Sequence, residues 1–232
     1  YDNMHRMMAS TISASGYSAS INYGYDLVGN MKKKTDYSVN SMGAYSYING
    51  TNKLASVILM NGSTETFGYD SKGNLTKRNN SQEAWYNVLN KPTRIQRLGS
   101  DVTLFYDSNW SRYKQVKIVN NQTTTTHYIG KLYEVEKTGN ISKKTSYISD
   151  IALITEGNAG NKIRFTHKDR LGSSTTFTDD AGNVTAYRSY DPFGKPKMGG
   201  GRLMSSYNLS ARLENNLHDS DNATTRGFTD HE

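Results

Sequence analysis

The chain has 232 residues and a formal net charge of +7, and only 34% of its residues are hydrophobic. It contains no cysteine, which excludes disulfide bonds, cysteine-ligated metals and thiol catalysis. No apolar run approaches the roughly 18 residues that a membrane-spanning helix requires. Aromatic residues supply much of the apolar surface, and together with 20 Gly and only 3 Pro this composition favours strands and turns over helices.

A motif that recurs about every 20 residues organises the first half of the chain. The sequence Tyr-Asp-Leu-Val-Gly-Asn-Met at residues 25–31 returns as Tyr-Asp-Ser-Lys-Gly-Asn-Leu at residues 69–75. Self-similarity at this period is typical of solenoids and related repeat architectures. Less regular copies of the motif lie at residues 1–7, 45–54, 86–91 and 106–112.

Each copy of the motif predicts the turn of a β-hairpin. Asp26 lies where its carboxylate can accept backbone N–H groups at the start of a type I turn. Gly29 then supplies the positive φ of the bulge residue that follows. Asp70 and Gly73 repeat this spacing, and the preceding residues 64–69 alternate in the manner of a half-buried strand.

Tyrosines at the strand ends are expected to replace much of the missing aliphatic core. Tyr25 and Tyr69 precede the turn acid of their repeats. Each ring could stack on its neighbour one repeat along while its hydroxyl stays hydrated or hydrogen-bonded. A strip of exposed tyrosines that stacks on a ligand is the alternative, but the spacing follows the repeat and so favours the structural role.

The second half of the chain carries more specific motifs. They are Asp-Arg-Leu-Gly-Ser at residues 169–173, Thr-Asp-Asp-Ala-Gly-Asn-Val at residues 178–184, and Tyr-Asp-Pro-Phe-Gly-Lys at residues 190–195. The Tyr-Asp repeats resemble the YD repeats of RHS (rearrangement hot spot) proteins, and these three segments resemble the RHS-associated core in its usual order. The motif residues marked by this resemblance are Asp169, Gly172, Asp179, Gly182, Tyr190, Asp191, Pro192 and Gly194.

The resemblance implies an all-β fold in which successive YD-repeat hairpins form a curved spiral sheet, part of a hollow shell. It implies a shell segment of a polymorphic toxin that encloses and helps to deliver a C-terminal toxin domain. The implied partners are the rest of the shell in the parent chain, the toxin cargo, and a secretion or delivery apparatus. The implied source is bacterial and the implied location is secreted or at the cell surface. An adhesion or carbohydrate-binding repeat module is the alternative function.

The chain divides into four regions on this basis. Residues 1–122 are predicted to form the YD-repeat hairpins and residues 123–197 the first part of the RHS-associated core. Residues 198–225 form a glycine-containing connector, in which residues 203–217 are the one candidate for a short helix because leucines recur four apart. Residues 226–232 resemble the start of the next core block, so we expect the chain to be a fragment or a processed product.

No catalytic, cofactor-binding or metal-binding residue is predicted, and the chain is not expected to be an enzyme. The five histidines lack the spacing of metal ligands, and no G-x-S-x-G sequence provides an activated serine. Self-cleaving RHS proteins resemble aspartyl proteases in using paired acids near an Asp-Pro-x-Gly-Leu motif. In this chain Lys195 replaces that leucine, so Asp191 is interpreted as a turn residue beside Pro192, which presets φ.

Basic residues are numerous but scattered among acidic ones. The one tight run, at residues 32–34, is interpreted as a solvated strand edge protected by lysine. A nucleic-acid site would gather Lys and Arg on one face beside stacking aromatics, and no such pattern is visible. Specific nucleic-acid binding is therefore not predicted.

Overall fold

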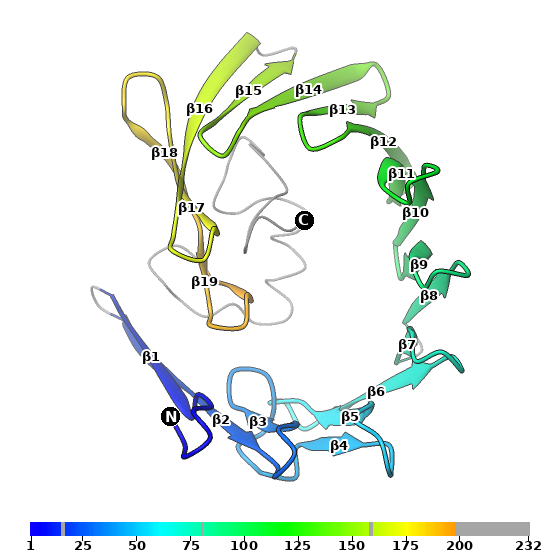
Figure 1. The fold of residues 1–232 in the computed structure, drawn as a ribbon, viewed down its shortest axis with the longest axis vertical. Coiled ribbons are helices and arrows are strands. Elements are labelled where there is room, and N and C mark those ends of the chain that lie inside the picture. The colour runs from blue at the N-terminus through cyan, green and yellow to red at the C-terminus, as the bar shows by residue number, and fades with distance from the viewer. Residues whose placement is uncertain (15–16, 80, 158–159, 198–232) are drawn as a thin grey trace. The chain divides into compact units, whose positions relative to one another are not determined.

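The computed structural model describes residues 1–14, 17–79, 81–157 and 160–197. These residues form strands, turns and irregular segments, with no helix among them (Figure 1). The predicted all-β fold of successive antiparallel hairpins is confirmed for this part of the chain. The short helix predicted near residues 203–217 and the core block predicted at residues 226–232 lie outside the described residues.

The strands fall into two compact units. The first unit contains residues 1–81 together with residues 189–197. Its strands are β1 (Ala9–Ala14), β2 (Tyr17–Tyr25), β3 (Met31–Lys34), β4 (Tyr45–Tyr47), β5 (Leu54–Ile58), β6 (Thr64–Tyr69), β7 (Leu75–Arg78), β19 (Ser189–Tyr190) and β20 (Pro196–Lys197).

The second unit contains residues 82–188. Its strands are β8 (Gln82–Tyr86), β9 (Pro92–Arg97), β10 (Ser100–Tyr106), β11 (Arg112–Val119), β12 (Gln122–Ile129), β13 (Tyr133–Thr138), β14 (Ile141–Ile148), β15 (Ala152–Gly157), β16 (Gly160–Lys168), β17 (Ser174–Thr178) and β18 (Val184–Tyr187).

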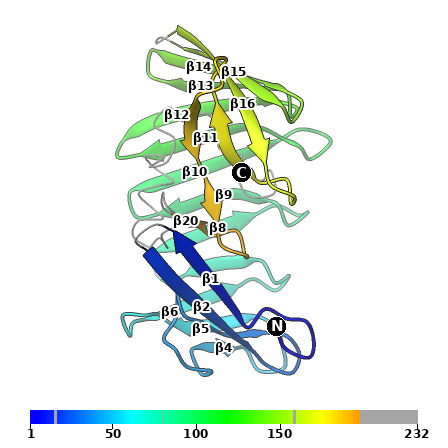
Figure 2. The same cartoon turned by 90° about the vertical axis from the view of Figure 1, so that its left-hand side faces the viewer.

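Strand order follows chain order throughout. Strands β1 to β3 form one small sheet, β4 to β18 form an antiparallel sheet of 15 strands, and β19 pairs with β20. A meander of this kind satisfies the backbone through neighbouring hairpins, so each strand depends on residues close to it in the sequence. Figure 2 shows the hairpins side by side, with their turns at the two edges of the sheet.

The sequence of the repeat explains the shape of each hairpin. Tyr25 pairs with Met31 and Tyr69 pairs with Leu75, and in both hairpins the register shifts just before the tyrosine. Such a bulge is what a type I turn with one additional left-handed residue produces. A Cβ at Gly68 would lie 3.3 Å from the Cβ of its cross-strand partner Lys77, a tight contact that glycine avoids.

Each unit has a small hydrophobic core. In the first unit Ala44, Tyr45 and Val57 are buried, and partly buried side chains that include Tyr47 and Phe67 pack on them. In the second unit the buried cluster is formed by Leu153, Phe177 and Ala186, with partly buried Tyr147 against it. Because these cores are small, the turns, which set the register of each hairpin, are important in determining the fold.

Candidate functional site

One turn geometry occurs eight times among the described residues. In each copy the Oδ1 atom of an Asp or Asn accepts the backbone N–H groups two and four residues later, at 2.7–3.1 Å. The N–H three residues later donates to the carbonyl of the same Asp or Asn. The eight acceptor residues are Asp2, Asp26, Asp70, Asn87, Asp107, Asp169, Asp179 and Asp191.

The third residue after each acceptor has a positive φ. The motif glycines occupy this position at Gly29 (φ 92°), Gly73 (90°), Gly172 (84°), Gly182 (84°) and Gly194 (83°). In the other three copies the position is held by His5 (58°), Asn90 (61°) and Trp110 (59°). These three copies are among the less regular copies of the motif in the sequence, and the feature that all eight share is an Asp or Asn followed by this spacing.

Hydrogen bonds favour the ionised form of Asp70 and Asp179. The Asn74 side chain, which donates to Oδ2 of Asp70 at 2.8 Å, is the main cause of a lowered pKa for Asp70; desolvation opposes it, and backbone N–H groups lower that pKa further. The Asn183 side chain and backbone lower the pKa of Asp179 in the same way. At neutral pH these carboxylates are therefore ionised acceptors that close their own hairpins.

Cations, rather than neighbouring rings, cover the motif tyrosines. The Arg6 guanidinium lies 5.0 Å from the ring centroid of Tyr25, and the Lys53 ammonium lies 5.8 Å from that of Tyr69. The hydroxyl of Tyr69 donates to the Leu54 carbonyl at 3.0 Å. In the described part of the chain neither Tyr25 nor Tyr69 pairs with another aromatic ring, so the expected ring-on-ring ladder is wrong for them.

Strand spacing gives the physical reason. Motif tyrosines in successive hairpins are two strands apart, about 10 Å, whereas ring centroids pair at about 4.5–7 Å. A lysine or arginine stem is long enough to bridge that distance and place a cation on the ring. The same arrangement recurs with Lys32 on Tyr47, Lys91 on Tyr106 and Arg112 on Tyr128.

The turn at Asp191 differs from the other copies because it is docked on distant residues. Its Oδ1 closes the turn as elsewhere, but its Oδ2 accepts a hydrogen bond from Nζ of Lys34 at 2.6 Å, across 157 residues of sequence. Lys195, four residues after the acid, donates to Oδ2 of Asp36 at 2.9 Å and to the Asp36 carbonyl at 3.2 Å. We call Lys34, Asp36, Asp191 and Lys195 the charge cluster; all four belong to the first unit.

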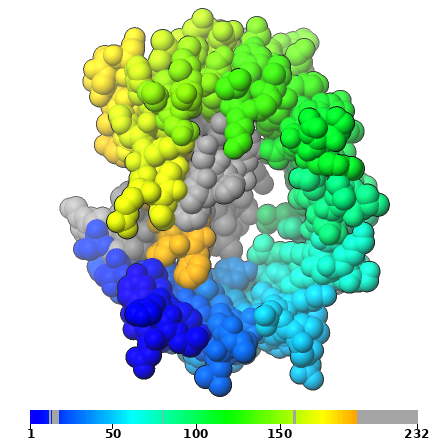
Figure 3. Space-filling view, viewed as in Figure 1, coloured from blue at the N-terminus to red at the C-terminus, as the bar shows by residue number. Residues whose placement is uncertain are grey.

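The charge cluster is buried. The side chains of Asp191 and Asp36 are 0% and 2% exposed, and those of Lys34 and Lys195 are 11% and 13% exposed. Phe193 completes the contact, with its ring 5.2 Å from that of Tyr23 and 5.7 Å from Nζ of Lys34. In Figure 3 the orange atoms of this segment lie against the blue atoms of the N-terminal hairpins.

The sequence does not reveal this cluster in advance. The interpretation of residues 32–34 as a solvated edge is wrong for Lys34, which is buried because it neutralises Asp191. The available signal was Lys195, since three other turn acids have Asn at the fourth position and bind its side chain with Oδ2. Lys195 at that position binds Asp36 instead, and Oδ2 of Asp191 binds Lys34. Tyr190 precedes the turn in β19, and Pro192 lies within it at an exposed position.

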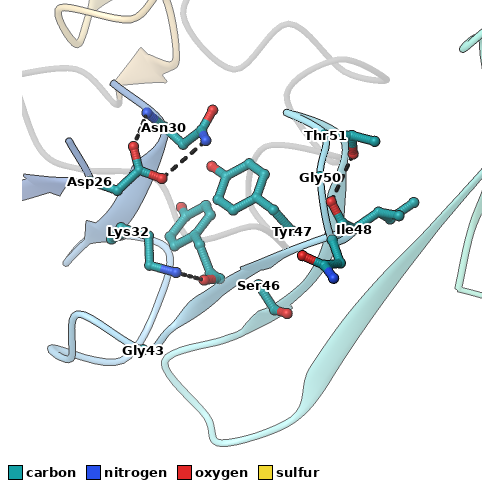
Figure 4. A pocket seen from close by; sticks show the side chains of 11 residues that line it. Asp26, Asn30, Lys32, Gly43, Ser46, Tyr47, Ile48, Gly50 and Thr51 are labelled. Carbon is teal, nitrogen blue, oxygen red and sulfur yellow. Dashed lines mark hydrogen bonds between the residues drawn. The ribbon is translucent and has the colours of Figure 1, made fainter. Parts of the chain in front are cut away.

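A second feature of the first unit is an open pocket of about 440 Å³ between β3, β4 and the turn after β4 (Figure 4). Several of its polar side chains are hydrogen-bonded to the protein itself. Asn30 donates to Oδ2 of Asp26 at 3.0 Å, the Lys32 ammonium to the Tyr45 carbonyl at 2.7 Å, and Thr51 to the Ile48 carbonyl at 2.8 Å. These bonds fit a hairpin junction better than a site that must offer its donors to a glycan.

Within residues 1–14, 17–79, 81–157 and 160–197, no group of three or more His, Asp or Glu side chains is arranged to hold a metal ion. A helix able to span a membrane is not found in the same residues.

Comparison with known proteins places the fold. No protein-family model matches the chain, and no curated protein matches it. Among solved structures, the match to a TcdB2–TccC3 structure has a TM-score of 0.59 at 12% identity and covers 93% of this chain and 11% of that chain. The match to a TcdB2–TccC3–Cdc42 structure has a TM-score of 0.58 at 12% identity and covers 92% of this chain and 13% of that chain. The match to a TcdB2–TccC3–TEV structure has a TM-score of 0.51 at 14% identity and covers 92% of this chain and 14% of that chain.

These likenesses concern the fold. At 12 to 14% identity, nearly the whole chain follows the backbone of a segment of each solved chain. The chain spans only 11 to 14% of the length of those solved chains.

Proposed function

We propose that this chain is a structural segment of an RHS-type shell that encloses a C-terminal toxin domain and helps to deliver it. The observation that carries the proposal is the turn repeated eight times, which builds hairpins side by side in chain order. The resemblance of the same motif to RHS repeats and the fold shared with TcdB2–TccC3 structures support it independently.

The proposed role is non-enzymatic. Asp191 is the one motif acid for which the sequence raised a catalytic role. Both of its oxygens accept hydrogen bonds: Oδ1 from two backbone N–H groups and Oδ2 from the Lys34 ammonium. A carboxylate that closes a turn and neutralises a buried lysine is occupied in the folded state, which supports a positioning role.

The proposed function implies which molecules the chain binds and where in or around the cell it acts. The partners would be the remaining shell of a longer parent chain, its toxin cargo and a delivery apparatus, and the location would be secreted or at the cell surface of a bacterium. Neither a cofactor nor a specific nucleic acid is part of the proposal.

Protease protection in the parent chain tests this function. The C-terminal domain of the intact parent should resist an added protease that cleaves the same domain when it is expressed alone. Removal of residues 1–232 should expose the domain to cleavage, while a parent that retains them and loses an exposed loop tip should stay protected. Unchanged protection after removal would refute the shell role, and tight binding of purified glycans by residues 1–232 would favour the adhesion module.

A further inference from the structure

The charge cluster holds an amine against a carboxylate in a buried site. Nζ of Lys34 lies 2.6 Å from Oδ2 of Asp191, and the side chain of Asp191 is 0% exposed. A nitrogen hydrogen-bonded to one carboxylate oxygen lies roughly 3–3.5 Å from the carboxyl carbon, which is the separation of a reacting pair before a bond forms. The two side chains are therefore close enough to condense to an amide.

Backbone groups around Asp191 suit attack at its carboxyl carbon. Oδ1 accepts the N–H groups of Phe193 and Lys195, each at 2.8 Å. Attack of an amine on Cγ places negative charge on one carboxyl oxygen, and two preorganised N–H donors stabilise such an oxyanion. Oδ2, the oxygen that faces Lys34, is then the one that leaves.

A second buried acid lies beside the amine. The side chain of Asp36 is 2% exposed, and its Oδ1 lies 3.7 Å from Nζ of Lys34. Oδ2 of Asp36 accepts a hydrogen bond from Lys195, whereas its Oδ1 has no hydrogen-bond partner among the described residues. A buried acceptor without a partner is costly, and a carboxylate beside an amine can take its proton. Asp36 is therefore placed to carry a proton for the condensation.

Aromatic rings exclude water from this pair. The Phe193 ring lies 5.7 Å from Nζ of Lys34 and 5.2 Å from the ring of Tyr23, which is 1% exposed. Two buried charges cost more to desolvate than two neutral groups, which favours transfer of a proton from the ammonium to the carboxylate. The neutral amine that results is the nucleophile.

We propose that Lys34 and Asp191 form an intramolecular amide bond with loss of one water molecule. One proton passes from the ammonium to Oδ2 of Asp191, and the electron pair of the neutral Nζ then forms the bond to Cγ while charge collects on Oδ1. Asp36 takes a second proton from the nitrogen and delivers it to Oδ2, and the Cγ–Oδ2 bond breaks as water leaves. The third proton of the ammonium stays on the amide, so atoms and charge balance.

The bond would tie the turn between β19 and β20 covalently to β3. It forms once in each chain and has no turnover, so the inference goes beyond the proposed shell role without making the chain an enzyme. Because the two residues are 157 positions apart, the bond closes a long loop of the unfolded chain and so opposes unfolding.

The mass of the denatured, unaltered chain measures the bond directly. It should be lower than the sequence mass by one water molecule, and protease digestion should release a branched peptide that joins the segments of Lys34 and Asp191. Lys34→Arg keeps the cation but has no nucleophilic amine, so it should retain the full mass. Asp36→Asn keeps the Lys34–Asp191 contact and should lose water about a hundredfold more slowly, because the proton carrier is gone.

An exposed ion pair of the same chain provides the matched control. Nζ of Lys168 lies 2.9 Å from Oδ1 of Asp150, whose side chain is 79% exposed. No branched peptide should form at this pair, and Lys168→Arg should lose water at Lys34 as the unaltered chain does. Circular dichroism will verify the fold of each variant, and the unaltered chain decides the question even where a variant fails to fold.

Three results would overturn the proposal. They are an unaltered chain that retains its full sequence mass after prolonged incubation in the folded state, a loss of water that persists in Lys34→Arg, and a branched peptide that joins other residues, such as Lys195 to Asp36. None of these results bears on protease protection of a cargo, so failure of this inference is separable from failure of the shell role.

Discussion

The turns at Asp179 and Asp191 share one backbone geometry and serve different purposes. Both acids accept two backbone N–H groups with Oδ1 and are followed by a glycine at positive φ. At Asp179 the second oxygen binds Asn183 of the same turn, whereas at Asp191 it binds Lys34 from a distant strand. The two turns differ at the fourth position, where Asn183 binds the acid of its own turn and Lys195 instead binds Asp36.

Docking matters for β19 and β20 because this hairpin has two residues in each strand. A pair of strands this short is not stable by itself in water. A buried ion pair adds little net stability, but removal of one partner leaves a charge without compensation. The charge cluster therefore positions the hairpin against β2 and β3, and loss of any member is expected to release it.

The largest expected effect comes from removing the cation that binds Asp191. Lys34→Ala leaves the Asp191 carboxylate buried without its partner and should reduce the free energy of unfolding of the first unit by about 3–5 kcal/mol. Urea unfolding, followed by hydrogen exchange at the amides of Phe193 and Lys195, measures the loss and locates it.

The matched control is Asn183→Ala, which removes the partner of the equivalent oxygen in the exposed Asp179 turn. Its effect should be much smaller and confined to the β17–β18 hairpin, because water replaces the lost donor there. Similar losses for the two variants would show that the Asp191 turn is no more docked than the Asp179 turn.

A smaller effect is expected where a turn is purely local. Gly73 has φ +90°, and its missing Cβ would meet only the end of the Lys53 side chain at 3.5 Å, so backbone strain dominates the cost of substitution. Gly73→Val should cost about 1–2 kcal/mol and raise hydrogen exchange in the β6–β7 hairpin, with the Asp191 turn unaffected.

Gly73→Asn provides the control, because asparagine occupies the same position at Asn90 with φ 61°. It should cost less than Gly73→Val. Normal protection of the β6–β7 hairpin in the valine variant would contradict the turn assignment, and spread of the effect to Asp191 would contradict its local character.

An increase in stability is expected at the strained copy of the turn. Trp110 holds a left-handed backbone conformation at φ 59°, where a large side chain is unfavourable. Trp110→Gly should stabilise the β10–β11 hairpin by about 1 kcal/mol in thermal unfolding of the monomeric chain at low concentration. A destabilised variant would show that the indole makes packing contacts worth more than the strain.

The sequence predicts the part of the structure that is local. The turns at Asp26 and Asp70 are readable because every bond that defines them lies within five positions. The contact between Lys34 and Asp191 spans 157 residues, and no periodic pattern encodes it. The sequence predicts ring stacking on Tyr69, and this prediction is wrong because motif spacing along the chain does not give the distance across two strands. At that distance a lysine ammonium, and not a second ring, lies over the Tyr69 ring.

The smallest expected effect is a dependence of the local turns on acid. Hydrogen bonds from Asn74 and from backbone N–H groups hold the pKa of Asp70 below its ordinary value of 3.8. Because the folded pKa is lowered, the stabilisation is present at pH values above 3.8 and is lost as the pH falls through the folded pKa.

Asp70→Asn keeps an Oδ1 acceptor, as Asn87 does in its own turn, and removes the titration. The variant should be slightly less stable than the unaltered chain at neutral pH, where the charged acceptor is stronger. Its β6–β7 hairpin should then lose less protection between pH 5 and pH 2 than the unaltered hairpin does, as judged by denaturant unfolding and hydrogen exchange at each pH. Parallel acid profiles for the two chains would mean that the Asp70 carboxylate is not what fixes this turn, and the contrast between a locally closed turn and the docked Asp191 turn would lose its electrostatic basis.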